Sequence, residues 1–341
     1  MIDSVGDTLT ISTKAPTSPP DAVDSMDTTD TTDTMDTLDT MDTMECDDPS
    51  LLCDDSNLVM RSLKALKSRV LSLQGTAANL PLPSFHIYLE KKVPLQGGLG
   101  GGSANAATVL YGANRLLPPA LRVGREVLKE LSCDLGSDVT FFLEANEESG
   151  TALCEGRGEV IDGEGYSWGG CGEGGKRVEV FKLRGVGCST PRIFGELGLE
   201  KGEEFSPRQF SPRQGGEGEG EGEDYGGNGG GSGGTFFEDG RGGKRRYENH
   251  LEGPVFKLET RIWELKQKMV ESGAWDVVMM SGSGASIFAV GYKEGKGGEF
   301  VEMIRGAEYP KGCPNGVQYF DGKGIGKTGG EDGWYEKNVA I

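Results

Sequence analysis

The sequence lacks the features of several common protein classes. It has no apolar run long enough to cross a membrane, and no charged head followed by an apolar stretch marks a secretory signal. Its seven cysteines form no C-x-x-C pair, which disfavours a zinc site or disulfide framework and is typical of a reducing compartment. The net charge of -19 also gives no sign of a basic surface for nucleic acid. We therefore expect neither a membrane nor a nucleic-acid partner.

Two low-complexity blocks carry much of the negative charge. From Asp27 to Asp42 an aspartate recurs at every third residue, which matches neither the helical period of about 3.6 nor the strand period of about two. The block also lacks the glycine and terminal glutamate of an EF-hand calcium loop. The second block is rich in Gly and Glu. We predict disordered insertions at about residues 24–47 and 213–243, in a chain whose length suggests about two domains.

Periodic apolar segments outside these blocks predict a mixed α and β structure. Strands are expected where apolar residues alternate, at residues 3–12, 85–93, 150–161 and 275–291, the last two as strand–turn–strand units. Helices are expected where apolar residues recur at helical spacing, at residues 57–73, 103–116, 121–131 and 255–270. The last of these has one apolar face, formed by Val255, Leu258, Ile262, Leu265 and Met269. The tail from about Lys323 is polar, rich in Gly and expected to be loose.

The segment VPLQGGLGGGSANAATVL places a glycine-rich loop between a strand and a helix. It lacks the third glycine of a dinucleotide fingerprint, since Ser103 stands there, and no βαβ series follows. A near match to a Walker A loop, DGKGIGKT, has Asp321 in place of the first Gly and lies in the tail, so we interpret it as chance. The remaining interpretation is a phosphate-binding loop at a helix N-terminus, with Ser103 either capping the helix or contacting phosphate or magnesium. A tight strand-to-helix turn is the alternative, although such a turn rarely needs more than one or two glycines.

Two further segments suggest functional chemistry. In DLGSDVTFF, Asp138 follows a Gly-Ser turn and precedes an apolar run, where a partly desolvated carboxylate could orient or deprotonate a hydroxyl. Asp138 as a helix N-cap is the alternative, and the residues alone leave both open. In MSGSGASIF, the small residues 281–284 allow a ligand or another backbone segment to come close. A plain hairpin turn would need fewer of them.

These segments, in this order, resemble the motifs of the GHMP kinase superfamily. The match narrows to the diphosphocytidyl-methylerythritol kinases of the non-mevalonate isoprenoid pathway, whose signature is close to P-x-G-A-G-L-G-G-G-S-S-N-A-A; here PLQGGLGGGSANAA departs at Gln96, Gly97 and Ala104. The other similar segments are LGSDVTFF, GTALCEGRGE, CSTPRIF, ENHLE and MSGSGASIFAVG. Thr140 stands where the family usually has Pro. Together the matches cover about residues 85–290 in family order.

The resemblance implies a two-domain α+β fold. It consists of a ribosomal protein S5 domain 2-like N-terminal domain, truncated here, at residues 1–175 and a ferredoxin-like C-terminal domain at residues 176–341. ATP and Mg²⁺ would bind between them, and the γ-phosphate would pass to the 2-hydroxyl of the methylerythritol moiety. The implied partner is this small-molecule substrate, with the chain a monomer or weak homodimer.

The resemblance also implies a role for each matching residue. Asp138 would be the catalytic aspartate, and Phe194 would lie against the cytosine ring, with Thr190 as a second substrate-binding residue. The phosphate loop would consist of Gly97, Gly98, Leu99, Gly100, Gly101, Gly102 and Ser103. Ser103 is also the candidate Mg²⁺ ligand. A supporting loop would consist of Ser281, Gly282, Ser283 and Gly284.

Two family elements have no counterpart in the sequence. Members open with a K-I-N strand, whose lysine pairs with the catalytic aspartate, and continue with a histidine near the cytosine. The histidines here, His86 and His250, lie in other motifs, so we expect an incomplete gene product with little turnover as it stands. Another GHMP small-molecule kinase and a non-catalytic nucleotide-binding remnant are the alternatives. The insertions suggest a eukaryote, where this pathway is plastidial; a bacterial protein would be cytoplasmic.

Overall fold

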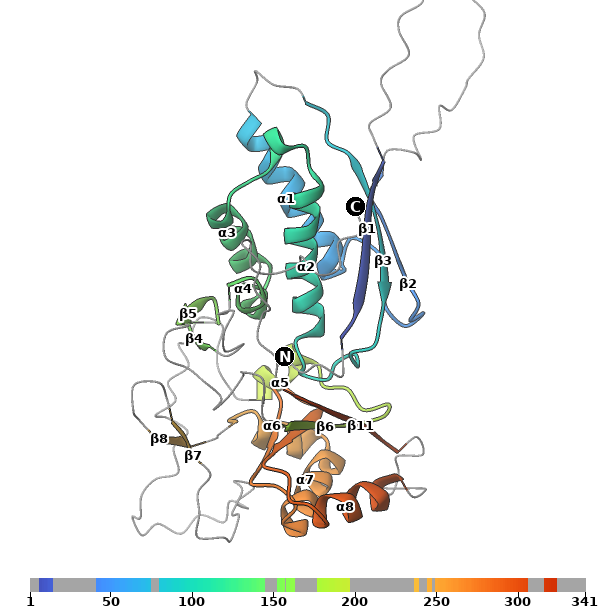
Figure 1. Cartoon of the computed structure of the whole chain (residues 1–341), viewed down its shortest axis with the longest axis vertical. Coiled ribbons are helices and arrows are strands. Elements are labelled where there is room, and N and C mark those ends of the chain that lie inside the picture. Colours follow the sequence, from blue (N-terminus) through green and yellow to red (C-terminus); the bar gives the residue numbers. More distant parts are fainter. Residues whose placement is uncertain are drawn as a thin grey trace, which may run out of the picture.

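The computed structural model describes the parts of the chain that carry the motifs. The described residues are 6–14, 41–74, 80–144, 152–156, 158–162, 177–196, 236–238, 244–246, 249–305 and 316–323. They form two main sheets, each with its own helices and its own buried core (Figure 1). None of the described helices combines the length and the apolar character that spanning a bilayer would need.

The N-terminal sheet has three strands in the order β1-β3-β2. The strands are β1 (Thr8–Lys14), β2 (Thr43–Cys46) and β3 (Ser84–Glu90). β1 runs antiparallel to β3, whereas β2 runs parallel to it. Every second side chain of β3, from Phe85 to Leu89, is buried, as the alternating sequence predicts.

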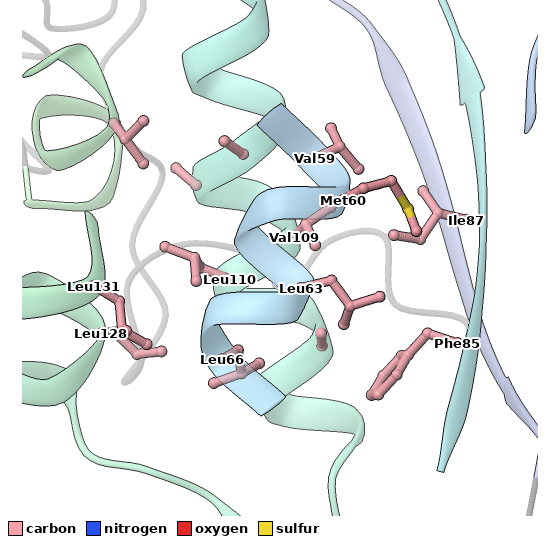
Figure 2. Packing of buried hydrophobic residues seen from close by; sticks show 14 of the residues in the cluster. Val59, Met60, Leu63, Leu66, Phe85, Ile87, Val109, Leu110, Leu128 and Leu131 are labelled. Atoms are coloured by element: carbon pink, nitrogen blue, oxygen red, sulfur yellow. The ribbon is translucent and has the colours of Figure 1, made fainter. Parts of the chain in front are cut away.

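Helices cover one face of this sheet. They are α1 (Leu58–Gln74), α2 (Gly101–Leu116), α3 (Arg125–Leu135) and α4 (Ser137–Glu144), with a 3-10 turn η3 (Pro119–Leu121) before α3. α2 lies between the sheet and α4, and it also contacts α1 (Figure 1). Figure 2 shows Leu63 and Met60 of α1 directed toward Phe85 and Ile87 of β3. This core fixes the strand and the helix that flank the glycine loop.

The C-terminal sheet has four antiparallel strands in the order β11-β6-β10-β9. They are β6 (Arg177–Leu183), β9 (Val277–Met280), β10 (Ser286–Val290) and β11 (Val317–Lys323). If the four strands are numbered 1 to 4 along the chain (β6, β9, β10, β11), their order across the sheet is 4-1-3-2. With helices between the first and second strands and between the third and fourth, this is the ferredoxin-like arrangement. The predicted two-domain α+β fold is confirmed.

The helices of this part are α5 (Thr190–Glu196), α6 (Glu252–Leu258), α7 (Thr260–Ser272) and α8 (Lys296–Arg305). Two short hairpins complete the described elements, β4 (Leu153–Glu155) with β5 (Val160–Asp162), and β7 (Phe236–Glu238) with β8 (Lys244–Arg246). The strand–turn–strand predictions for residues 150–161 and 275–291 are confirmed by β4–β5 and β9–β10. The boundary at residues 175/176 lies outside the described residues and stays a prediction.

The structure corrects three details of the prediction. The helix expected at residues 255–270 is two helices, because Glu259 has a non-helical backbone (φ -140°, ψ 79°) and its carboxylate binds Arg261. β2 occupies the end of the segment predicted as the acidic insertion, and β7 lies inside the predicted Gly/Glu insertion. β11 includes the first three residues of DGKGIGKT and ends at Lys323, where the predicted loose tail begins, so a strand that was not predicted from the sequence leads into that segment. The remaining insertion and tail residues lie outside the described ones.

Candidate active site

The glycine loop connects the end of β3 to the start of α2, as the sequence predicts. The helix begins at Gly101, two residues before the predicted start, and its N-cap is Gly100 in the left-handed region (φ 68°). No side chain caps this helix, and Ser103 is its third residue. The prediction that Ser103 could cap α2 is therefore wrong, and its hydroxyl stays a predicted contact of phosphate or magnesium.

The first turn of α2 presents backbone donors. The first helical hydrogen bond runs from the Ala104 N–H to the Gly100 carbonyl at 2.8 Å. The N–H groups of Gly101, Gly102 and Ser103 precede that bond, so they have no partner within the helix. Together with the helix dipole, they favour an anion at this end of α2.

The second Gly/Ser loop, at residues 281–284, lies directly against the glycine loop. Ser281 Oγ donates to the Gly98 carbonyl at 2.8 Å, and the Ala285 N–H donates to the Gln96 carbonyl at 3.2 Å. A Cβ at Gly98 would overlap the Ser281 carbonyl oxygen and lie 2.9 Å from the Gly284 carbonyl oxygen. The prediction that these small residues admit another backbone segment is confirmed, and that segment is the glycine loop itself.

Two residues of the ENHLE segment hold this second loop in place, a role that the sequence did not reveal. Asn249 Nδ2 donates to the carbonyls of Met280 and Gly282, both at 2.8 Å. Glu252 Oε1 accepts the Met280 N–H at 2.9 Å. Its other oxygen binds Lys266 Nζ at 2.6 Å. The segment that resembles the family's N-D-L-E motif thus fixes the loop that supports the phosphate loop.

Asp138 is the second residue of α4. It lies inside the first turn of the helix, and among the described residues no backbone N–H donates to its carboxylate, so the N-cap alternative is wrong. The residue is exposed, yet partial burial among its neighbours raises the pKa of its carboxyl. The hairpin β4–β5 contributes to these surroundings, since Gly158 lies against Ser137.

α4 also contacts the phosphate loop. The Phe142 ring is so close to Gly100 that a Cβ there would lie 2.8 Å from it. Asp138 and Phe142 are four residues apart in α4, so their side chains share a face of the helix at neighbouring turns. The predicted catalytic carboxylate is therefore about one helical turn from the contact with the phosphate loop.

The predicted substrate-binding residues lie on α5. Thr190 Oγ1 and Ser283 Oγ form a hydrogen bond of 2.8 Å, and this bond joins the start of α5 to the second Gly/Ser loop. Phe194 is one turn further along the helix, and the residue is 46% exposed. Contacts thus run from the glycine loop through residues 281–284 to α5. The structure therefore connects Thr190, and next to it Phe194, to the predicted nucleotide site.

The described residues contain no cluster of three His, Cys, Asp or Glu side chains that could hold a metal ion. The magnesium prediction rests on Ser103 and on the nucleotide phosphates, which in such sites bind magnesium together with water molecules and a few protein side chains.

Comparison with known proteins agrees with the family resemblance of these motifs. Residues 57–145 match the family described as the GHMP kinases N terminal domain. The 4-diphosphocytidyl-2-C-methyl-D-erythritol kinase of Protochlamydia amoebophila (strain UWE25) is 31% identical over 247 residues, which are 72% of this chain and 67% of that protein. The chloroplastic enzyme of the same name from Arabidopsis thaliana is 30% identical over 240 residues, 70% of this chain. The match covers 51% of the Arabidopsis protein, so the chain spans about half the length of that relative.

A solved structure shows the same fold. It is a crystal structure of 4-(cytidine 5'-diphospho)-2C-methyl-D-erythritol kinase, with a TM-score of 0.52 and 22% identity, covering 93% of this chain and 86% of the other. The segment that matches the GHMP kinases N terminal domain, residues 57–145, includes the glycine loop, α2 and α4, and thus Asp138. The chain belongs to the 4-diphosphocytidyl-2-C-methyl-D-erythritol kinase family of GHMP kinase phosphotransferases.

Proposed function

We propose that this chain transfers the γ-phosphate of ATP to the 2-hydroxyl of 4-diphosphocytidyl-2-C-methyl-D-erythritol, in the non-mevalonate (MEP) pathway to isoprenoid precursors. The names of the relatives support the acceptor. The observation that carries the proposal is the contact between Phe142 of α4 and Gly100, because Asp138 precedes Phe142 by one turn of the same helix.

The phosphate groups of ATP would bind at the N-terminus of α2. The backbone N–H groups of Gly101, Gly102 and Ser103 are the donors, and no described atom blocks the outer side of Gly102. Magnesium, when bound, neutralises charge on the phosphates, and the Ser103 hydroxyl is its proposed protein ligand. Phosphoryl transfer depends mainly on such positioning and charge neutralisation.

Asp138 would act on the acceptor. Its exposed carboxylate accepts the proton of the 2-hydroxyl as the new O–P bond forms and the bond between the γ-phosphorus and the bridging oxygen of ADP breaks. The surroundings that raise the pKa of Asp138 make it a stronger proton acceptor than an ordinary aspartate. The exposed ring of Phe194 would stack on the cytosine, and Thr190 would hold the substrate next to it.

The proposal is tested by incubating excess protein with γ-labelled ATP and one of three acceptors, diphosphocytidyl-methylerythritol, homoserine or mevalonate. We expect label only in the first, at a low rate, and none with Asp138→Asn. Transfer to homoserine or mevalonate would instead indicate another GHMP kinase. ATP binding without transfer to any acceptor would indicate the non-catalytic alternative.

The cellular setting follows from the relatives and stays part of the proposal. The plant relatives are named as chloroplastic, so a eukaryotic source would place the chain in the plastid stroma, and a bacterial source in the cytoplasm. Only a small-molecule partner is proposed, with the chain a monomer or weak homodimer. Sedimentation at increasing protein concentration tests the oligomeric state.

A further inference from the structure

A buried ion pair lies at the base of the phosphate loop. Asp7, just before β1, and Lys91, just after β3, are 2.6 Å apart, and their side chains are 2% and 5% exposed. Removing two charges from water is unfavourable and is tolerated only where hydrogen bonds satisfy both groups. The proposed transfer reaction uses neither residue, so the pair requires another explanation.

Asp7 makes hydrogen bonds on both sides of the loop. Its Oδ1 accepts the backbone N–H groups of Lys92 and Val93, at 2.8 Å and 2.7 Å, where the chain enters the loop. Its Oδ2 accepts Lys91 Nζ at 2.6 Å and Asn105 Nδ2 at 2.8 Å. Asn105 belongs to the start of α2, where the chain leaves the loop. One carboxylate thus joins the two ends of the segment 94–104.

The charge of Asp7 also has a local effect. Lys91 Nζ lies beneath the first turn of α2, 3.4 Å from the position that a Cβ of Gly101 would occupy. A buried ammonium group there would repel the positive end of the helix dipole unless an anion neutralised it. Burial by itself would raise the pKa of Asp7, but the hydrogen bonds from Lys91, Val93 and Asn105 lower it, so the carboxylate is ionised at neutral pH.

We propose that Asp7 is a positioning residue of the phosphate loop, which fixes the spacing of its two ends and so determines the affinity for ATP. The inference rests on the proposed binding of ATP phosphates by this loop. Asp7 does not touch the nucleotide; it acts through the backbone of Val93 and through Asn105.

The same domain offers a matched control at the other end of β3. Asp42 binds Lys67 Nζ at 2.8 Å and accepts the Phe85 N–H at 2.9 Å. Both aspartates therefore combine a lysine with a backbone N–H beside β3, but Asp42 precedes β2, and its hydrogen-bond partners in the described part of the chain, Lys67 and Phe85, lie outside the phosphate loop. Replacing either carboxylate by an amide removes an ion pair with a lysine, although the Asp42–Lys67 pair is less buried, with side chains 18% and 21% exposed.

The experiment compares the full chain with three variants, Asp7→Asn, Asp42→Asn and the double variant Asp7→Asn/Lys91→Met. Amide hydrogen exchange is followed in peptides that cover residues 94–104, and ATP affinity is measured by titration. We expect Asp7→Asn to accelerate exchange in that segment more than elsewhere and to weaken ATP binding about tenfold, the effect of one lost hydrogen bond to a charged group. The double variant should recover part of both, because it also removes the buried ammonium charge, which keeps its bond to the Val93 carbonyl but has lost the balancing carboxylate.

Asp42→Asn should leave exchange in residues 94–104 and ATP affinity at the wild-type values. If both single variants accelerate exchange to the same extent throughout the N-terminal domain, Asp7 is a general stabilising residue and the proposal is overturned. If the wild-type chain binds no ATP, the proposed function fails, while the exchange comparison still decides whether Asp7 fixes the loop.

Discussion

Replacing Gly102 by alanine separates nucleotide binding from folding. Gly102 is the second residue of α2, it is exposed, and a Cβ there would meet no described atom within 4 Å. Alanine therefore fits the fold without strain. Because alanine also restricts the unfolded chain, we expect the substitution to raise the free energy of unfolding by about 0.4–1 kcal/mol.

The effect on ATP affinity should have the opposite sign. Because a Cβ in a helix tilts toward the helix N-terminus, the added methyl group would occupy open space beside the first turn of α2, next to the N–H groups that the phosphates are proposed to use. A hydrogen bond to a charged group contributes about 1.5–3 kcal/mol, so losing one lowers affinity at least about tenfold. Higher stability with lower affinity is the expected combination.

Substitutions at neighbouring glycines should lower stability and affinity together. Gly98 has φ 68°, and a Cβ there would overlap the Ser281 carbonyl oxygen, so Gly98→Ala must disturb the contact between the two loops. A Cβ at Gly101 would lie 2.9 Å from Val93 Cγ1, so Gly101→Val adds a packing conflict of about 1–3 kcal/mol to any effect on phosphate. Both variants serve as comparisons for Gly102→Ala.

The assay combines thermal unfolding without ligand with an equilibrium titration of ATP for each variant. If Gly102→Ala is more stable and binds ATP with wild-type affinity, the phosphates do not lie over this turn of α2 and the assignment of the loop is wrong. A loss of stability in Gly102→Ala would show that the surroundings of the turn are not open.

The remaining predictions concern catalysis and the insertions. Asp138→Asn should lower single-turnover transfer by about 10²–10⁴ and leave ATP affinity nearly unchanged, because the helix terminus and not this carboxylate binds the nucleotide. Because burial raises the pKa of Asp138, the carboxylate takes up its proton earlier as the pH falls. The rate should therefore decline at a higher pH than an ordinary aspartate would give, and a pH–rate profile checks this. Deleting residues 24–40 should leave the melting temperature nearly unchanged, since each doubling of loop length costs only about 0.6 kcal/mol. Deleting residues 24–47 should lower it strongly, because β2 would be lost from its pairing with β3.

Much of the fold was predictable because most elements have a regular apolar period. The alternation in β3 and the helical spacing in α1 both match the observed burial. β2 was not predictable from its own residues, since TMEC stands at the end of a repeat whose period fits no strand. Its position depends on tertiary contacts, in which Asp42 binds Lys67 and the Phe85 N–H. The break at Glu259 was missed because the apolar period continues through it.

The candidate site was predictable in its motifs but not in the contacts between them. The order of the segments indicated the glycine loop, Asp138 and residues 281–284, yet no pattern in the sequence indicates that Asn249 and Glu252 hold the second loop. Asp7 was missed for the same reason. Its partners are 84 to 98 positions away, so only the folded chain reveals that it joins the two ends of the loop.

The glycine run itself has a second explanation in the structure. Gly98 lies against the backbone of Ser281, Gly100 lies against the Phe142 ring, and Gly101 lies against Val93. These three positions exclude larger side chains even without a ligand, so the number of glycines is weaker support for phosphate binding than the sequence alone suggests. The stronger support comes from two features that the described residues do not explain. The N–H groups of the first turn of α2 have no hydrogen-bond partner among those residues, and the space at Gly102 is open. Gly102 is therefore the position at which a ligand, and not the fold, would exclude a side chain.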